Sequence, residues 1–227
     1  MKYIPSIAFE EMSGSAKGVT AAKTRGRKYI RNRGYGSNVR TEFQSSVKSV
    51  FKQLSQAWQG LTNAQILAWN AAAGTAEAKS VLGSKTKITG SNLFMRLNYW
   101  VVYCGGNILT VPPTLTGVDA PSEAVITLTA DKFTFELEQA PAGAENLRLV
   151  IQASEPQSNG ITRAYAKAAA FRSPLPVALT EMDIKADYDA KYGAPSAGAP
   201  KIFMKYFFVN VQTGEKSGEM LASVKLG

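Results

Sequence analysis

The sequence of 227 residues contains 26 Lys and Arg, 17 Asp and Glu, and no His, which gives a formal net charge of +9. Without histidine the chain lacks the commonest general base, the Ser–His–Asp triad and the commonest metal ligand. Its single cysteine, Cys104, excludes an intrachain disulfide and a cysteine-based zinc site, and the apolar run around it predicts a buried small side chain. We therefore expect a protein that is not an enzyme, with no catalytic residue, metal ligand or cofactor.

The positive charge is concentrated near the N-terminus. Residues 1–40 hold nine basic and two acidic residues, whereas residues 126–227 hold eleven of each. The first segment has closely spaced Gly and Ser and little helical or strand periodicity, so it predicts an extended basic arm. Three interpretations of this arm stay open: direct contact with DNA, contact with a neighbouring subunit, and a solvated tail. The candidate contact residues are Lys23, Arg25, Arg27, Lys28, Tyr29, Arg31 and Arg33.

Residues 41–110 predict a helical module. Apolar residues recur every three or four positions after Thr41, which predicts a first helix with Thr41 as its N-cap and Gly60 after its end. A third helix is predicted over roughly Ser91 to Tyr103, with Ser91 as a candidate cap and the sequence "CGG" as its end.

The stretch "LTNAQILAWNAAAG" predicts a second, short helix between these two. Thr62 is a good N-cap, Gln65 stands at the capping-box position, and Gly74 is a candidate left-handed stop. Two short amphipathic helices bury little surface alone, so the module must pack on something else. The candidate packing or interface residues are Trp58, Leu61, Trp69, Phe94 and Trp100.

The remaining chain predicts a linker and a β-rich domain, so the fold class is α+β. Residues 111–124 are rich in Pro and turn residues and predict a linker. Over residues 125–227 the apolar period changes to two, and about seven short strands predict an immunoglobulin-like or fibronectin-like antiparallel β-sandwich. Two hairpins are expected, one turning near Asp131 and one around "TGEK", with further strands in "RAYAKAAAFRS" and "PVALT". A short helix in "EMDIKADYDAKYG" should end at Gly193.

The acidic residues of this short helix are candidates for a calcium or carboxylate site. Asp183 and Asp187 are four residues apart and could share a helix face with Asp189 close by, but the spacing fits no EF-hand loop. A solvated helix face is the preferred interpretation.

The sequence also predicts no membrane contact. The first residues lack the apolar core of a signal peptide, and the most apolar later stretch, Tyr99 to Val111, is too short to span a bilayer. We expect a protein that is made in the cytoplasm.

Two motifs suggest a family. The pattern W-x-x-L-T-x-x-Q-x-x-A-W-N-A-x-A spans Trp58 to Ala73, and S-N-L-F-x-R-L-N spans Ser91 to Asn98. Together they resemble virion structural proteins of tailed phages and prophages of Bacteroidetes, including crAss-like phages. In such proteins a basic arm with a GR-x-Y-x-R-like turn, here Gly26 to Arg31, precedes the helical hairpin, and a β-sandwich follows. The resemblance implies no catalytic residues.

On this resemblance we expect a structural subunit of a tailed-phage virion, made in the host cytoplasm and located in the particle. The segregated charge and the absence of catalytic motifs favour a subunit of a neck or tail ring, the head–tail connector, that forms homo-oligomers through its arm and helices. The alternatives are a capsid-associated auxiliary or decoration protein and a nucleic-acid-binding protein that uses the basic arm. The expected partners are other virion proteins, with DNA contact through the arm as an option.

Overall fold

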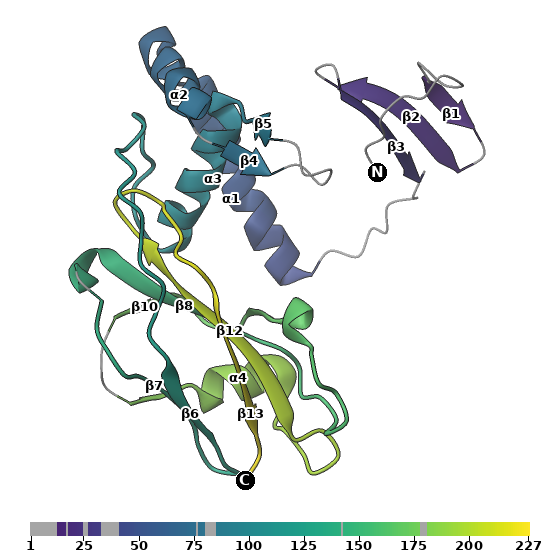
Figure 1. Cartoon of the computed structure of the whole chain (residues 1–227), viewed down its shortest axis with the longest axis vertical. Coiled ribbons are helices and arrows are strands. Elements are labelled where there is room, and N and C mark those ends of the chain that lie inside the picture. The colour runs from purple at the N-terminus through teal and green to yellow at the C-terminus, as the bar shows by residue number, and fades with distance from the viewer. Residues whose placement is uncertain are drawn as a thin grey trace.

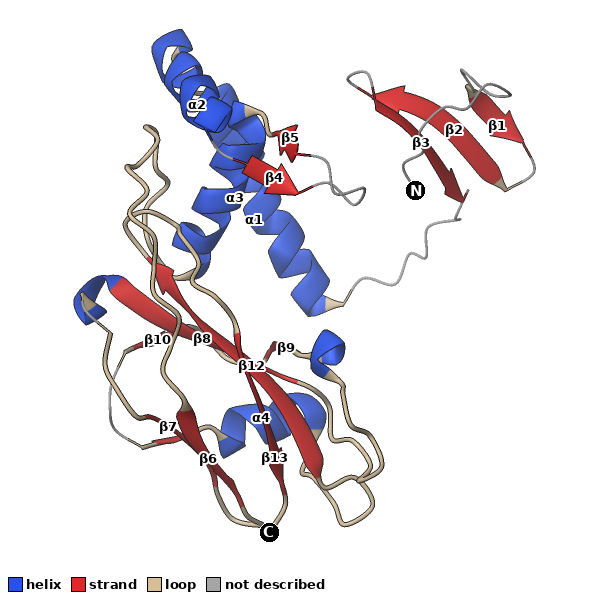
Figure 2. Cartoon of the chain, viewed as in Figure 1, coloured by secondary structure: helices blue, strands red, loops and turns tan. Residues whose placement is uncertain are grey.

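The computed structural model is mixed α+β, with α-helices and antiparallel sheets (Figure 1). It describes residues 13–16, 18–24, 27–32, 41–75, 77–79, 85–141, 143–177 and 181–227. Figure 2 shows α1, α2 and α3 grouped at one end, whereas α4 lies among the strands at the other. The fold therefore has a helical module and a C-terminal β region, and a small sheet precedes both.

The N-terminal segment contains regular structure. Strands β1 (Gly14–Ala16), β2 (Val19–Thr24) and β3 (Arg27–Asn32) form an antiparallel sheet in the order β1-β2-β3. The expectation of an arm without strand structure is wrong for these residues. The glycines that suggested a linker include a turn residue, because Gly18 has a φ of 89° and connects β1 to β2.

The helical module begins with two capped helices, α1 (Glu42–Gln59) and α2 (Asn63–Thr75). Thr41 caps α1 as predicted, since its hydroxyl accepts a hydrogen bond from the Gln44 amide at 3.2 Å. The predicted capping box of α2 is also confirmed. The backbone N–H of Gln65 donates to Thr62 Oγ1 at 3.4 Å, and the backbone N–H of Thr62 donates to the side-chain oxygen Oε1 of Gln65 at 2.9 Å.

The third helix, α3 (Gly90–Tyr103), follows two short paired strands, β4 (Glu77–Lys79) and β5 (Lys85–Lys87). Its N-cap is Thr89 and not the predicted Ser91, because Thr89 Oγ1 accepts from the Asn92 amide at 3.4 Å. It ends at the "CGG" sequence as predicted.

Two glycines that were predicted to end helices, Gly60 and Gly74, do not act as left-handed stops. Gly60 follows α1 with a right-handed φ of −82°, so the turn into α2 does not need glycine's freedom. Gly74 lies inside α2, which continues to Thr75. Ala72 and Ala73, just before it, pack in the cluster that contains Phe94 of α3, which favours helix at this end of α2 although glycine has a low helix propensity.

The C-terminal β region (residues 124–227) has two antiparallel sheets. In one, the order is β11-β7-β6, and in the other it is β10-β8-β12-β13, with β9 also pairing with β8. The strands are β6 (Ala124–Leu128), β7 (Phe133–Leu137), β8 (Leu147–Ala153), β9 (Ala169–Ala170), β10 (Leu175–Pro176), β11 (Met182–Asp183), β12 (Lys201–Asn210) and β13 (Met220–Lys225).

Most predicted elements of this region are confirmed. The hairpins β6–β7 and β12–β13 form, and α4 (Lys185–Tyr192) ends at Gly193, whose φ is 78°. The stretch "RAYAKAAAFRS" is mostly not a strand: it holds a 3₁₀ turn at Tyr165–Lys167 and the two residues of β9. Within "PVALT" only Pro176 belongs to a strand, and residues 178–180 lie outside the described residues.

One core cluster contains side chains from both sheets and from α4. Phe135 of β7 meets Tyr206 of β12 with ring centroids 5.1 Å apart, and Phe133 meets Tyr188 of α4 at 5.3 Å. The other face of β12 is covered as well: Phe207 packs against Trp100 of α3 at 5.3 Å. Strand β12 is thus the element that joins the two parts of the fold.

The junction also depends on one glycine in the β12–β13 connection. Gly214 has a φ of 73°, and a Cβ atom there would lie 2.3 Å from the Leu97 carbonyl oxygen of α3. The backbone of this connection can approach α3 so closely only because a side chain is missing.

We expect Gly214→Ala to lower the free energy of unfolding by about 1 to 3 kcal/mol, because the methyl group pushes the connection away from α3. The matched control is Gly143→Ala, where φ is also positive, at 68°, but no atom lies within 4 Å of the added Cβ. Thermal unfolding of both variants, followed by circular dichroism, measures the difference. Equal unfolding temperatures for the two variants would show that the approach at Leu97 is not required.

Candidate functional site

The aromatic residues singled out in the helical module form its core. Trp69 and Phe94 are fully buried and meet edge to face, with ring centroids 5.3 Å apart. Trp58 packs on Phe94 at the same distance, and the Trp69 indole donates to the Thr110 carbonyl at 2.9 Å. Leu61 is partly buried against the same cluster. These four side chains therefore stabilise the module itself.

Trp100 belongs to a second group, at the junction with the β region. Its ring contacts Tyr99, Tyr103 and Phe207. Lys216 Nζ lies 3.9 Å from the Phe207 ring centroid and 5.6 Å from that of Trp100, which adds a cation–π contact to the junction.

The outward side of α2 is an apolar surface that the sequence analysis did not identify. Ala64, Leu67, Ala71 and Gly74 are exposed and follow each other at spacings of three and four residues, so they lie on one face. Leu67 exposes 67% of its surface. We call these four residues the α2 stripe. No residue from 53 to 76 is charged, and this signal was readable in the sequence.

The predicted apolar stripe of the first helix is only partly covered. Leu54 is buried, whereas Phe51 is 46% exposed and stacks on Tyr99 with ring centroids 5.2 Å apart. Tyr99 stacks in turn on Tyr103. Burial raises the pKa of Tyr99, and it raises the pKa of Tyr103 to about 12, so both phenols are neutral across the physiological range.

The candidate residues of the basic segment are divided between the two faces of the β1–β3 sheet. Pairing places Arg31 opposite Thr20, Tyr29 opposite Ala22, and Lys28 opposite Lys23. Side chains alternate along a strand, so Arg27, Tyr29 and Arg31 share one face, and Lys23 and Lys28 share the other. Arg25 and Arg33 lie outside the described residues.

A surface cavity of about 580 Å³ lies between α3, α4 and the β9–β10 segment, with Tyr103, Phe171, Arg172, Asp187 and Lys191 in its lining. Arg172 Nε lies 3.3 Å from the Asp187 carboxylate, so part of its charge is already compensated. Burial lowers the pKa of Lys191, whose ammonium group donates to the Ala170 carbonyl.

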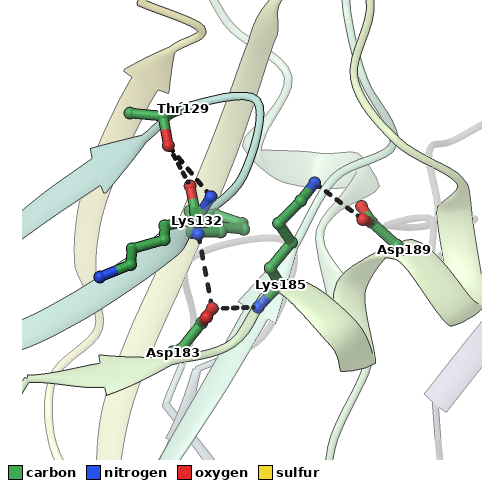
Figure 3. Close-up of polar contacts among 6 residues, drawn as sticks. Thr129, Lys132, Asp183, Lys185 and Asp189 are labelled. Atoms are coloured by element: carbon green, nitrogen blue, oxygen red, sulfur yellow. Dashed lines mark hydrogen bonds and ion pairs between the residues drawn. The ribbon is translucent and has the colours of Figure 1, made fainter.

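The candidate acidic residues have partners within the fold: Figure 3 shows those of Asp183 and Asp189, and Asp187 lies 3.3 Å from Arg172. Asp183 belongs to β11, not to the helix; its carboxylate accepts from the Lys185 amide at 2.9 Å and from the Phe133 amide at 3.4 Å, which ties the start of α4 to β7. Lys185 Nζ donates to Asp189 at 2.8 Å. Among the described residues, no group of three or more acidic or cysteine side chains is arranged to hold a metal ion.

Comparison with known proteins identifies no family for this chain. Neither a scan against protein-family models nor a search of curated proteins returned a match for this chain. In the part of the chain that the structure describes, no helix has both the length and the apolar character needed to cross a bilayer.

Cys104 lies at the junction, beside Trp100 and Tyr103, in the cluster around Phe207. Burial raises the pKa of its thiol from 9.0 to about 11, and the charge of Arg148 offsets part of this rise. At pH 8 the folded chain therefore holds about a hundredfold less thiolate than an unfolded chain, and the thiolate is the reactive form.

We expect iodoacetamide to alkylate Cys104 far more slowly in the folded protein at pH 8 than in guanidinium chloride. The rate in the folded protein should rise about tenfold per pH unit up to pH 11, whereas the rate in the unfolded chain should level off above pH 9. Mass spectrometry follows the reaction, and one label per chain in denaturant is the control. Rapid labelling of the folded protein at pH 8 would contradict the raised pKa of this partly buried thiol.

Proposed function

We propose that this chain is a non-enzymatic structural subunit of a tailed-phage virion, in a neck or tail ring of the head–tail connector. It assembles with copies of itself and with other virion proteins through the helical module. The observation that carries the proposal is the α2 stripe, which is exposed and apolar and lies in a segment without charge. The motif resemblance of residues 58–73 and 91–98 supports the virion assignment.

The α2 stripe has the properties of a buried interface. α2 is covered on the side of Trp69 and Ala73, whereas the α2 stripe is exposed with the uncharged Asn63 and Asn70 beside it. Charged side chains are depleted at interface cores. The small side chains of Ala64, Ala71 and Gly74 permit close helix approach, and full burial of Leu67 would contribute about 1 to 2 kcal/mol per copy.

We further propose that the β region is an immunoglobulin-like or fibronectin-like sandwich that makes peripheral contacts. In the immunoglobulin constant-type domain, strands A, B and E belong to one sheet and strands C, F and G to the other. The order β6-β7-β11 corresponds to A-B-E, and the order β8-β12-β13 corresponds to C-F-G. The short strands β9 and β10 pair at the edge of β8, where a fibronectin-like domain differs from the constant-type domain.

We expect Leu67→Glu to abolish self-association, because it places a charge in the centre of the α2 stripe. The wild-type chain should form discrete oligomers, measured by size-exclusion chromatography with light scattering. The matched control is Val125→Glu, which adds the same charge at a residue of β6 that is 53% exposed. Val125→Glu should leave the oligomer intact.

A wild-type chain that is monomeric at all concentrations, or a Leu67→Glu oligomer like that of the wild type, would contradict assembly through α2. Antibody labelling of purified particles then tests the location, with label at the neck or tail expected. Label over the capsid shell would favour the capsid-associated alternative, and absence from particles would contradict the virion assignment.

A further inference from the structure

We propose that the face of the β1–β3 sheet formed by Arg27, Tyr29 and Arg31 binds single-stranded nucleic acid. We call it the Arg–Tyr–Arg face. The inference goes beyond the assembly role, since it concerns a surface that contains no residue of α2. Its variants leave the α2 stripe unchanged, so the two proposals succeed or fail separately.

The strand register defines this face. Arg31 pairs with Thr20, Tyr29 with Ala22 and Arg27 with Thr24, and directly opposed residues of an antiparallel pair point to the same side. The Ser15 hydroxyl of β1 lies 2.9 Å from that of Thr20, which places Ser15 on the same side. The partners of the three long side chains are small; Arg27 and Arg31 are exposed, and Tyr29 is partly buried.

The opposite face has a different chemistry. Lys23 and Lys28 lie there with Val19, Ala21 and Ile30. Val19 is 41% exposed, whereas Ala21 and Ile30 are partly covered. This face therefore combines apolar surface with lysine charge, and the Arg–Tyr–Arg face combines an aromatic ring with guanidinium groups.

Charge selects a polyanion as the partner. The sequence has no Asp or Glu between Glu11 and Glu42, so no acidic side chain within this segment offsets its basic residues. Arg27 and Arg31 are both exposed, and their four-residue separation along an extended strand spans about 14 Å. Guanidinium groups bind phosphate oxygens in a bidentate fashion and stay charged at any physiological pH.

The ring of Tyr29 selects a single strand over a duplex. It lies between the two arginines, opposite the small Ala22, and is only partly buried, so a flat base can stack on its exposed part. Bases in a duplex are already stacked on each other, whereas single strands present base faces to aromatic side chains on open sheets. Arginines on either side of an aromatic ring match phosphates on either side of a stacked base.

The test uses the full-length chain and fluorescently labelled 12-nucleotide oligothymidine, with oligouridine of the same length and a 12-base-pair duplex as further probes. Arg27→Gln with Arg31→Gln removes two charges from the proposed face. Lys23→Gln with Lys28→Gln removes two charges from the opposite face and is the matched control. Fluorescence anisotropy over a series of salt concentrations gives the dissociation constant and its salt dependence.

The double arginine variant should bind at least tenfold more weakly, and the slope of log K against log salt should fall by about 1.4, since each lost phosphate contact on a single strand removes about 0.7. The lysine control should change affinity less than threefold. Tyr29→Val should lose about 5- to 150-fold, as expected for one stacked base, whereas Tyr29→Phe should keep the wild-type affinity.

Equal losses in the arginine and lysine variants would overturn the proposal, because binding would then follow net charge and not this face. Tighter binding of the duplex than of both single strands would also overturn it. Hydrogen exchange over residues 14–32 checks that the sheet stays folded in the two Tyr29 variants. The exchange rates should be the same in Tyr29→Val and Tyr29→Phe. If they are, an affinity of Tyr29→Val equal to that of Tyr29→Phe excludes stacking.

Discussion

Strand β12 is buried on both of its faces, and the rest of the structure is arranged around that constraint. Met204, Tyr206 and Phe208 belong to the core shared by the two sheets and α4, whereas Phe207 and Val209 belong to the cluster under α3. An ordinary strand of an antiparallel sandwich has one solvated face. The second face of β12 is mostly covered: Phe203 packs against Tyr165, and Phe207 and Val209 lie under α3, whereas Lys201 and Lys205 are partly exposed. The contact under α3 fixes where the helical module attaches.

This attachment explains how the helices are used. α3 packs against β12 on one side and against α1 and α2 on the other, so its apolar residues make their contacts within the chain. α2 lies on the far side of α3 from the sheets and keeps one uncharged face exposed (Figure 1). The internal contacts and the exposed uncharged face thus lie on neighbouring helices, α3 and α2, and the proposed self-assembly would use only the second.

Local sequence signals predicted most of the helical and hairpin structure. The Thr62–Gln65 capping box and the Thr41 cap are made by residues within three positions of each other, so the sequence contains the whole interaction. Period-two alternation was sufficient for the β6–β7 hairpin in the same way. The strand content of residues 14–32 was missed because small residues such as Ala21, Ala22 and Gly14 weaken the alternation.

Long-range contacts were not predictable from these signals. The close approach of Gly214 to Leu97 joins residues that are more than a hundred positions apart, and no local pattern indicates it. The same holds for Phe51, which belongs to the periodic stripe of α1 but stacks on Tyr99 of α3 and stays 46% exposed. Once β2 and β3 are assigned as strands, the alternation of side chains predicts which basic residues lie on each face of the sheet. No such rule predicts the other candidate surfaces.

The contact between Trp100 and Phe207 has a consequence for biosynthesis. A ribosome completes α3 long before it reaches β12, and domains begin to fold as they emerge. During this interval the helical module displays Trp100 and Tyr103 without the strand that later covers them, and such uncovered aromatic surface favours aggregation. The chain is therefore most vulnerable while it is still being translated, and a burst of synthesis inside a crowded cell is the condition under which chaperone assistance matters most.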